Sequence, residues 1–313
     1  MSAHWSERGE GGGRFAIWLI RSIGLYLGRP FARVLLYPIT LYFFLRRGPE
    51  RRASRVFLRR AFGRRSSSFA VLRHLHAYAA TILDRVFLLT GALDRFDVRI
   101  HGLEHLEAQM AHGRGVLLLG AHIGSFEVLR TLAARRPDVR VRVVMDRQQT
   151  PAMTDLLHAL NPAVAEEIID AGGDAGALAL AMQDAAQQGA LIGLLADRAR
   201  PREAVSMIDF LGHAAPFPTG PYLVASVLNL PVVLCFALYG GGNRYDLYFE
   251  TFAERIAIPR AARAAGAADW AQRYAARLEH YTRLDPYNWF NFYDFWNPAG
   301  GERTVGEPAA SRG

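Results

Sequence analysis

A histidine and a glutamate stand five positions apart in the segment GAHIGSFE, which occupies residues 120–127. In a continuous helix this spacing would turn the two side chains about 140° away from each other. If His122 instead precedes a helix and Glu127 lies in its first turns, the carboxylate can fold back onto the imidazole. We therefore predict that His122 removes a proton from an attacking group, while Glu127 orients the ring and stabilises its protonated form.

The sequence offers no protein nucleophile to accompany this pair. It contains no G-x-S-x-G motif, and its only cysteine, Cys235, lies within the apolar run at residues 231–238. Both observations argue against a covalent acyl-enzyme, so we expect a bound hydroxyl or amine to attack the acyl group directly. The backbone amides near Gly124 and Ser125, at the expected helix start, would stabilise the oxyanion. Gly124 would also let the acyl carbonyl approach closely.

Strands and helices must bring these residues together. Three short apolar runs predict buried strands at residues 115–121, 190–196 and 231–238, and residues 139–145 are a further strand candidate. Helical patterns alternate with the later runs and also precede the first, at residues 66–91, 125–135, 151–160, 176–188 and 260–284. This alternation predicts an α/β fold with a mostly parallel central sheet flanked by helices.

Polar residues directly follow three of the predicted strands. His122 follows the first, Asp146 and Arg147 follow the second, and Asp197 and Arg198 follow the third. Ligands of parallel sheets bind beyond the carboxyl ends of the strands, so we expect all five residues on one rim. Arg147, Asp197 and Arg198 are therefore candidate substrate-binding residues, although Arg147 beside Asp146 is also compatible with a surface ion pair.

The N-terminal third carries most of the positive charge. The formal net charge of the chain is +8, yet residues 1–100 alone hold 18 arginines against 6 acidic residues. Residues 15–45 are strongly apolar, but arginines and two prolines interrupt them and the longest uncharged piece has 12 residues. A membrane-spanning helix needs about 20. Because nine arginines follow between residues 46 and 65, we predict an amphipathic helical arm that lies on the cytoplasmic face of a membrane.

The sequence of this arm is also compatible with a buried helical hairpin that has a solvated basic face, or with a segment that binds nucleic acid. The arginines interleave with Val, Leu and Phe and join an apolar segment, so membrane lipids are the better partner and we expect no nucleic acid. We divide the chain into a membrane-associating arm at residues 1–65, a catalytic domain at 66–298 and a disordered tail at 299–313.

The H-x4-E arrangement in GAHIGSFE, Arg147 after the second strand and Asp197 in LLADR together resemble the lysophospholipid acyltransferase superfamily. The closest likeness is to the branch that contains the late acyltransferases of lipid A. It extends over roughly residues 15–298, because the apolar arm, the FLG segment at residues 210–212 and the aromatic segment PYNWFNFYDFW at residues 286–296 also fit this branch.

The resemblance implies that His122 is the general base, that Glu127 is its partner, and that Arg147 and Asp197 belong to the acceptor or donor pocket. It also implies an acyl carrier protein or coenzyme A thioester as donor, at the cytoplasmic face of a bacterial inner membrane. Asp294 stands where lipid A enzymes commonly carry basic residues, and Arg198 follows the pocket aspartate. Both departures favour another glycolipid, an aminolipid or a polyene-type lipid over diphosphorylated lipid A as the acceptor.

Two alternative functions have to be separated from acyl transfer. A thioesterase would use His122 to activate water, and a non-enzymatic membrane-binding protein would not need His122 at all. The sequence shows no nucleotide-binding motif, and its single cysteine leaves no Cys-based metal cluster. We therefore expect no resident cofactor and no metal, with the acyl thioester as the co-substrate.

Overall fold

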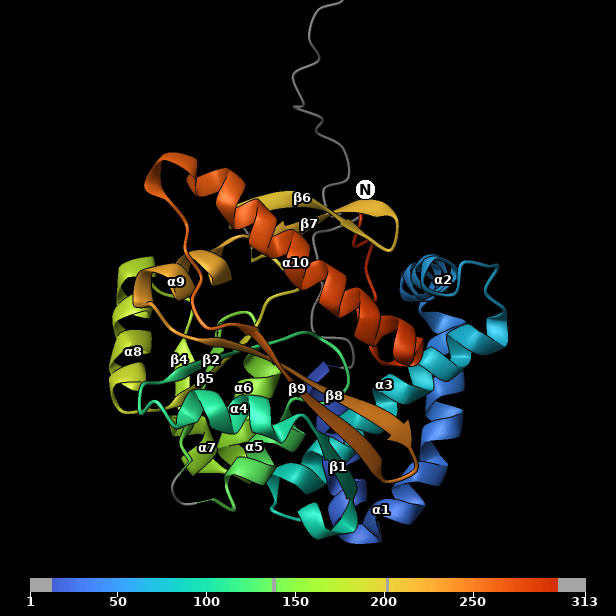
Figure 1. The fold of residues 1–313 in the computed structure, drawn as a ribbon. Helices are drawn as coiled ribbons and strands as arrows, with labels where there is room; N and C mark the ends of the chain where they lie inside the picture. Colours follow the sequence, from blue (N-terminus) through green and yellow to red (C-terminus); the bar gives the residue numbers. More distant parts are fainter. Residues whose placement is uncertain (1–12, 137–138, 201–202, 298–313) are drawn as a thin grey trace, which may run out of the picture.

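The computed structural model describes residues 13–136, 139–200 and 203–297, so the predicted tail at 299–313 lies outside the described residues. A seven-stranded sheet in the order β1-β9-β8-β2-β5-β3-β4 forms its centre (Figure 1). The strands of this sheet are β1 (Asp97–His101), β2 (Val116–Gly120), β3 (Val141–Met145), β4 (Ile168–Asp170), β5 (Leu191–Leu195), β8 (Val232–Gly241) and β9 (Arg244–Ala253). A separate antiparallel hairpin consists of β6 (Val205–Phe210) and β7 (His213–Pro218).

Five neighbouring strands of the sheet run in the same direction. β2 is parallel to β5 and β8, and β3 is parallel to β5 and β4. β9 turns back against β8, and β1 is parallel to β9. The mostly parallel α/β fold is thus confirmed, and the carboxyl ends of β2, β5 and β3 share one edge of the sheet.

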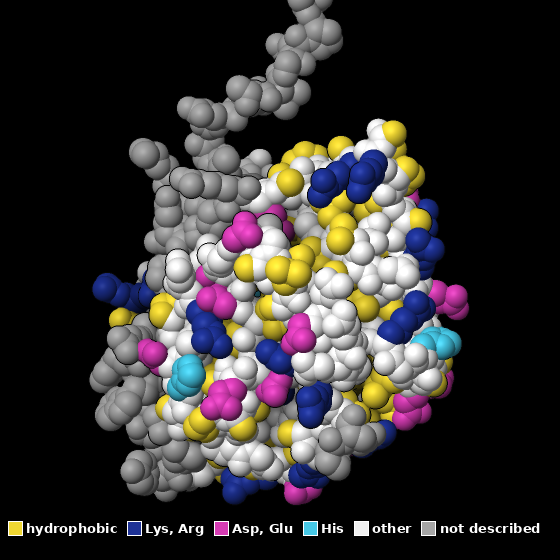
Figure 2. All heavy atoms as spheres, turned by 90° about the vertical axis from the view of Figure 1, so that its left-hand side faces the viewer, with side chains coloured by type: hydrophobic (Ala, Val, Ile, Leu, Met, Phe, Trp, Pro, Cys, Tyr) yellow, Lys and Arg dark blue, Asp and Glu magenta, His cyan; other side chains and the backbone are white. Residues whose placement is uncertain are grey.

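Helices cover both faces of the sheet and both of its sides (Figure 1). Their bounds are α1 (Gly13–Arg46), α2 (Gly48–Phe62), α3 (Ser68–Leu89), α4 (Leu103–Met110), α5 (Glu127–Ala133), α6 (Pro151–Leu160), α7 (Pro162–Glu166), α8 (Ala175–Gln187), α9 (Gly220–Leu228) and α10 (Arg263–Leu284). α1 to α3 lie on the side opposite α8 and α9. The face over α8 and α9 carries positive and negative side chains interspersed (Figure 2).

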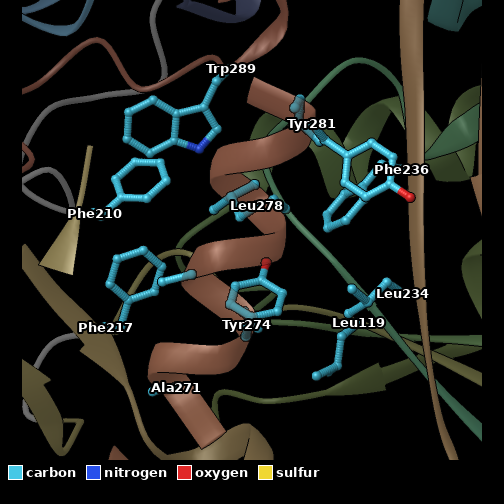
Figure 3. Packing of buried hydrophobic residues seen from close by; sticks show 14 of the residues in the cluster. Leu119, Phe210, Phe217, Leu234, Phe236, Ala271, Tyr274, Leu278, Tyr281 and Trp289 are labelled. Carbon is cyan, nitrogen blue, oxygen red and sulfur yellow. The ribbon is translucent and has the colours of Figure 1, made fainter. Parts of the chain in front are cut away.

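Helix α10 joins the sheet to the β6–β7 hairpin. Its buried side chains, including Tyr274 and Leu278, lie between Phe210 and Phe217 on one side and the strand residue Leu119 on the other (Figure 3). The Tyr274 hydroxyl donates a hydrogen bond of 2.6 Å to the carbonyl of the last residue of β2. A buried Tyr hydroxyl needs such a partner, and here the bond fixes the strand end that precedes His122.

Helix α1 bends at Gly28, where the backbone φ is 78°, and its second half packs on α3. Arg29 forms an ion pair of 2.7 Å with Asp84, a residue of α3 whose side chain is fully buried. Arg33 approaches the same carboxylate at 3.7 Å and donates a hydrogen bond to the Tyr239 hydroxyl. Two of the arginines that interrupt the apolar segment therefore point into the protein. No helix among the described residues has the length and apolar character needed to cross a bilayer.

Helix α2 is tied to α3 and to the C-terminal segment by a buried histidine. Ser54 of α2 lies 2.8 Å from His74 Nδ1, and His74 Nε2 lies 3.0 Å from the carbonyl oxygen of Trp289. Burial lowers the pKa of His74 to about 3, so its imidazole is neutral and donates one bond while accepting the other. The division of the chain at residue 65 stays a prediction, but these bonds cross it.

Candidate active site

The loop after β2 is held between β8 and the C-terminal segment. Ile123 forms an antiparallel bridge with Trp289, and Gly124 forms a parallel bridge with Ala237 of β8. Gly124 has a φ of +60°, and a Cβ at this position would lie 1.7 Å from the Ala237 carbonyl oxygen. Only glycine fits such a close backbone approach at a positive φ. Because this loop is pinned, helix α5 begins at Glu127 rather than at the predicted residue 125.

The predicted role of the Gly124 and Ser125 amides is wrong. The Gly124 N–H donates a hydrogen bond of 2.9 Å to the Asn288 carbonyl, and the Ser125 N–H donates one of 2.9 Å to the Ala237 carbonyl. Both amides are therefore committed within the fold and do not form an oxyanion hole. The space that Gly124 leaves open is filled by strand β8, so it does not serve the approach of an acyl carbonyl.

His122 is bound to Asp197, which follows β5. The distance from His122 Nδ1 to Asp197 Oδ1 is 2.7 Å, and the His122 backbone N–H is 3.1 Å from each carboxylate oxygen. The Asp197 side chain is fully buried, whereas the His122 side chain is 32% exposed. β2 and β5 are adjacent parallel strands, so the two residues meet because their strands end side by side.

The C-terminal aromatic segment completes the surroundings of this carboxylate. Trp289 Nε1 donates a hydrogen bond of 3.0 Å to Asp197 Oδ2, and Asn291 Nδ2 donates one of 3.2 Å to the same oxygen. The Phe290 N–H donates one of 2.7 Å to the His122 carbonyl. Every acceptor of a buried carboxylate needs a donor, and here the ring and backbone N–H groups of His122 act together with Trp289 and Asn291 to supply them.

Electrostatics favour an ionised Asp197 beside a neutral His122. Burial opposes the charge of Asp197, but the interaction with His122 and its hydrogen bonds hold the pKa of the carboxyl well below its ordinary value. Burial lowers the pKa of His122 and the positive charge of Arg198 lowers it further, while Asp197 partly offsets both. Since an ionised carboxylate only accepts hydrogen bonds, His122 Nδ1 carries the proton and Nε2 is left as the basic nitrogen.

Glu127 occupies a different place from the one expected. Its carboxylate lies 3.2 Å from Arg85 Nε of α3 and accepts a hydrogen bond of 3.3 Å from the Ser125 hydroxyl. Burial opposes ionisation of Glu127, but the charges of Arg85 and Arg130 keep the pKa of its carboxyl below the ordinary value. The hydrogen bond that orients the imidazole comes from Asp197, so the expected contact between Glu127 and His122 is corrected.

The remaining predicted residues separate into two groups. Arg198 lies next to the pair, where its guanidinium donates hydrogen bonds to the Asn291 side chain and to the Phe290 carbonyl. Arg147 and Asp146 follow β3, which lies beyond β5. Arg147 points back to the carbonyls of Ala165 and Ile168 at 3.4 Å, and Asp146 caps its own turn through the amides of residues 148 and 149. No contact joins this second group to His122 among the described residues.

Three residues of the site are not predicted from the sequence. Trp289 and Asn291 stand out there only as part of an aromatic segment, and Arg85 lies in a helix with no motif around it. A polar residue among aromatics was the available signal for Asn291, since a buried amide has to find partners. Arg85 is the one basic residue between residues 77 and 94, and a charge in a mostly apolar stretch of helix is most often paired.

Comparison with known proteins assigns the sequence to a family. The family model for bacterial lipid A biosynthesis acyltransferases matches residues 15–297. No individual curated protein matches the sequence. The match includes helix α1, the His122 loop, Asp197 and the C-terminal aromatic segment, and it implies acyltransferase activity in lipid biosynthesis and an association with bacterial membranes. The chain therefore belongs to the bacterial lipid A biosynthesis acyltransferase family.

Proposed function

We propose that this protein transfers an acyl chain from an acyl carrier protein or coenzyme A thioester to a hydroxyl or amine of a lipid or glycolipid. His122 is the general base, and Asp197 holds it in the productive orientation and tautomer. The observation that carries the proposal is the contact of 2.7 Å between His122 Nδ1 and the buried Asp197 carboxylate, with the imidazole partly exposed. It leaves a neutral base whose free nitrogen is available to a substrate.

The reaction follows from this arrangement. His122 Nε2 takes the proton of the acceptor O–H or N–H as the acceptor atom bonds to the thioester carbonyl carbon. The carbonyl oxygen becomes an oxyanion, and the positive imidazolium is stabilised by Asp197. When the oxyanion collapses, the C–S bond breaks and the thiolate leaves with the proton that His122 returns. The products are an acylated lipid and a free thiol, and His122 is neutral again.

We further propose that Arg85 provides the positive charge for the oxyanion, because the nearby amides of Gly124 and Ser125 are engaged within the fold. Burial and the charge of Arg198 lower the pKa of His122 most, and the charge of Arg85 adds to them, which puts Arg85 within electrostatic reach of the imidazole. Glu127 then acts as a positioning residue that holds Arg85 through their ion pair. In a partly buried site a fixed guanidinium stabilises a developing negative charge more strongly than water does.

The proposed location is the cytoplasmic face of a bacterial inner membrane, with helix α1 as the attachment. One side of α1 packs on the protein, while its other side presents large apolar side chains at Phe31, Val34, Tyr37, Leu41, Tyr42 and Leu45, between 48% and 68% exposed. Phe31, Val34, Tyr37, Leu41 and Leu45 follow one another at steps of three or four residues, and Tyr42 adjoins Leu41, so together they form one stripe of the helix. A contiguous exposed apolar stripe is typical of a surface that contacts lipid or another protein.

The test is a transfer assay with purified full-length protein. Acyl carrier protein and coenzyme A thioesters are incubated with and without a bacterial lipid extract, and both acylated lipid and free fatty acid are measured by mass spectrometry. Acylated lipid that requires the extract and is lost in His122→Ala supports the proposal. Free fatty acid formed equally without the extract would show a thioesterase. Equal transfer by the His122→Ala protein would exclude the proposed chemistry.

A further inference from the structure

A cavity of about 470 Å³ opens where the end of α2, the β6–β7 turn and the end of α10 meet. Helix α2 ends there among several arginines, and the turn of the FLG segment forms the opposite wall. None of the described residues that line the cavity carries a carboxylate. Its charged or titratable lining residues are Arg59, Arg60, Arg64, Arg65, Arg283 and His213.

The positive charge in this cavity is only partly neutralised. Arg283 is paired with Glu279 at 2.8 Å. Within the described ranges, no carboxylate lies within ion-pair distance of Arg59, Arg64 or Arg65. An unbalanced group of guanidinium side chains around a concave surface is suited to an anion, because each one offers paired N–H donors in a rigid plane.

Arg60 is the least exposed of the arginines that line this cavity. Its guanidinium lies over the Trp296 ring at 4.0 Å, and its Nε and Nη1 are buried without a hydrogen-bond partner. Burial lowers the pKa of Arg60, the Asp294 carboxylate partly offsets this, and the positive charge of Arg59 lowers it further. Buried donors without acceptors are rare in folded proteins, and the stacking on Trp296 holds this positive charge at the wall of the cavity.

The cavity is separate from the catalytic residues. Arg60 contacts Trp296, and the Trp296 ring lies 6.0 Å from that of Trp289, which in turn donates to Asp197. A layer of aromatic side chains thus stands between the arginines and the His122 pair. Neither His122 nor Asp197 lines the cavity. Its ligand is therefore not the reacting part of the substrate.

We propose that this cavity binds the phosphate group of an anionic phospholipid and so fixes the protein at the membrane surface. Phe69, four residues after Arg65, is 73% exposed at the start of α3. An exposed aromatic beside clustered arginines is typical of a surface that meets the headgroup region. Helix α2, which carries Arg59 and Arg60, directly follows the exposed apolar stripe of α1.

A phosphate group fits the cavity better than an acidic protein partner does. A cavity of about 470 Å³ has room for a headgroup. A stable protein complex needs roughly 1,200 Å² of buried surface, most of which would fall outside such a cavity. Binding of an acidic protein in the cavity is therefore the competing outcome that the experiment has to exclude.

The experiment measures partition of the full-length protein onto vesicles. One set contains phosphatidylcholine alone, and the other contains phosphatidylcholine mixed with phosphatidic acid. Arg64→Gln/Arg65→Gln removes charge from the cavity, and Arg260→Gln/Arg263→Gln removes the same charge from exposed positions before and at the start of α10. His213→Trp keeps every arginine but narrows the cavity, which separates a shaped site from general attraction. Thermal unfolding of each variant confirms that it folds.

The cavity variants are expected to lose binding only to vesicles with phosphatidic acid. Each arginine near an anionic surface contributes about fivefold, so Arg64→Gln/Arg65→Gln should reduce partition roughly 25-fold. His213→Trp should reduce it at least about fivefold, whereas Arg260→Gln/Arg263→Gln should leave it unchanged. Glycerol phosphate, a soluble headgroup without acyl chains, should compete with the vesicles for the parent protein.

Three results would overturn the proposal. Full binding by the His213→Trp protein, or an equal loss in Arg260→Gln/Arg263→Gln, would show diffuse attraction without a site. Unchanged vesicle binding by the cavity variants, together with loss of saturable glycerol phosphate binding, would assign the cavity to a free phosphate compound. Unchanged vesicle binding with a lost complex to acyl carrier protein would assign it to an acidic protein. All three readouts are independent of transfer activity.

Discussion

His122 and Asp197 should behave as one catalytic unit. Without its base the enzyme is expected to lose transfer activity by about 10²- to 10⁴-fold, so His122→Ala should fall in this range. Asp197→Asn should follow closely, because an amide in this position no longer fixes the proton on Nδ1. The double variant should lose little more than either single one, as measured by kcat for acyl transfer. If the losses of the two single variants multiply in the double variant, the two residues do not act as one catalytic unit.

Glu127 provides the contrast within the same experiment. It lies against Arg85 and Ser125, so its removal is expected to act through the guanidinium. Glu127→Gln should therefore combine with His122→Ala as an independent change in an assay sensitive enough to follow both. If instead Glu127 and not Asp197 forms the unit with His122, the pattern of the two double variants is reversed.

The position of Arg198 predicts a shift in the pH dependence. His122 acts as a base only when it is neutral, so kcat/KM should rise with pH through the pKa of His122 and then level off. Burial, followed by Arg198, brings the pKa of His122 below its ordinary value of 6.5. Arg198→Gln removes a nearby positive charge, so the acidic limb should move to higher pH. Arg142 lies on β3 and is paired with Glu167. Arg142→Gln should leave the acidic limb in place.

A limb that stays in place in Arg198→Gln would show that the charge of Arg198 does not reach the imidazole. The readout is the midpoint of the limb and not the height of the plateau. A modest loss of stability or of substrate affinity in the variant therefore does not imitate the effect.

Helix α1 should be held against α3 by its buried ion pair. Arg29→Met leaves the fully buried Asp84 without its closest partner. Breaking a buried ion pair typically costs about 3–5 kcal/mol, and Arg33 at 3.7 Å and the Tyr245 hydroxyl at 3.0 Å compensate only part of the remaining charge, so the thermal unfolding midpoint should drop. Asp84→Asn added to Arg29→Met removes the charge itself and should restore part of the loss. Equal stability of the parent and the Arg29→Met protein would show that α1 is not anchored through this pair.

The sequence allowed the central elements to be predicted, because a strand buried on both faces reads as a continuous apolar run. β2, β5 and β8 were found in this way, and β3 was also predicted although Arg142 interrupts it and most of its residues are half-buried. β1 and β9 were missed because polar and charged residues interrupt them, as in the run RYDLYFETFA of β9. β4 has only three residues and gives no pattern. Strands at or next to the edge of the sheet, and short strands, depend on their partners, which a single sequence does not reveal.

The sequence predicted which residues lie at the edge of the sheet, but not which of them contact each other. Parallel strands bring His122 and Asp197 to one edge, and the sequence showed both strand ends. Which strands are neighbours was not visible, and the order β2-β5-β3 is what separates His122 from Arg147. The motif spacing made Glu127 the nearer carboxylate along the chain. Contacts over 75 residues and over 92 residues, from His122 and Trp289 to Asp197, were decided by the fold.

The exposed apolar stripe of α1 should govern attachment of the protein to membranes. Leu41→Gln/Leu45→Gln replaces two side chains that are 48% and 63% exposed. A buried leucine contributes about 1.5–3 kcal/mol, so partition onto phosphatidylcholine vesicles should fall at least tenfold. Leu180→Gln/Val227→Gln changes two exposed apolar residues on α8 and α9, on the opposite side of the protein, and should have no effect. Equal losses in both proteins would place the attachment elsewhere.

The bonds from Trp289 and Asn291 to Asp197 have a consequence for synthesis of the chain. A ribosome adds His122 and Asp197 long before it adds the segment that supplies these donors and bridges the His122 loop. A nascent chain that already carries its basic N-terminus, and so can meet the bilayer, still has a carboxylate without its full set of partners. The proposed catalytic pair therefore obtains its full set of hydrogen bonds only after residues 289–291 have been translated.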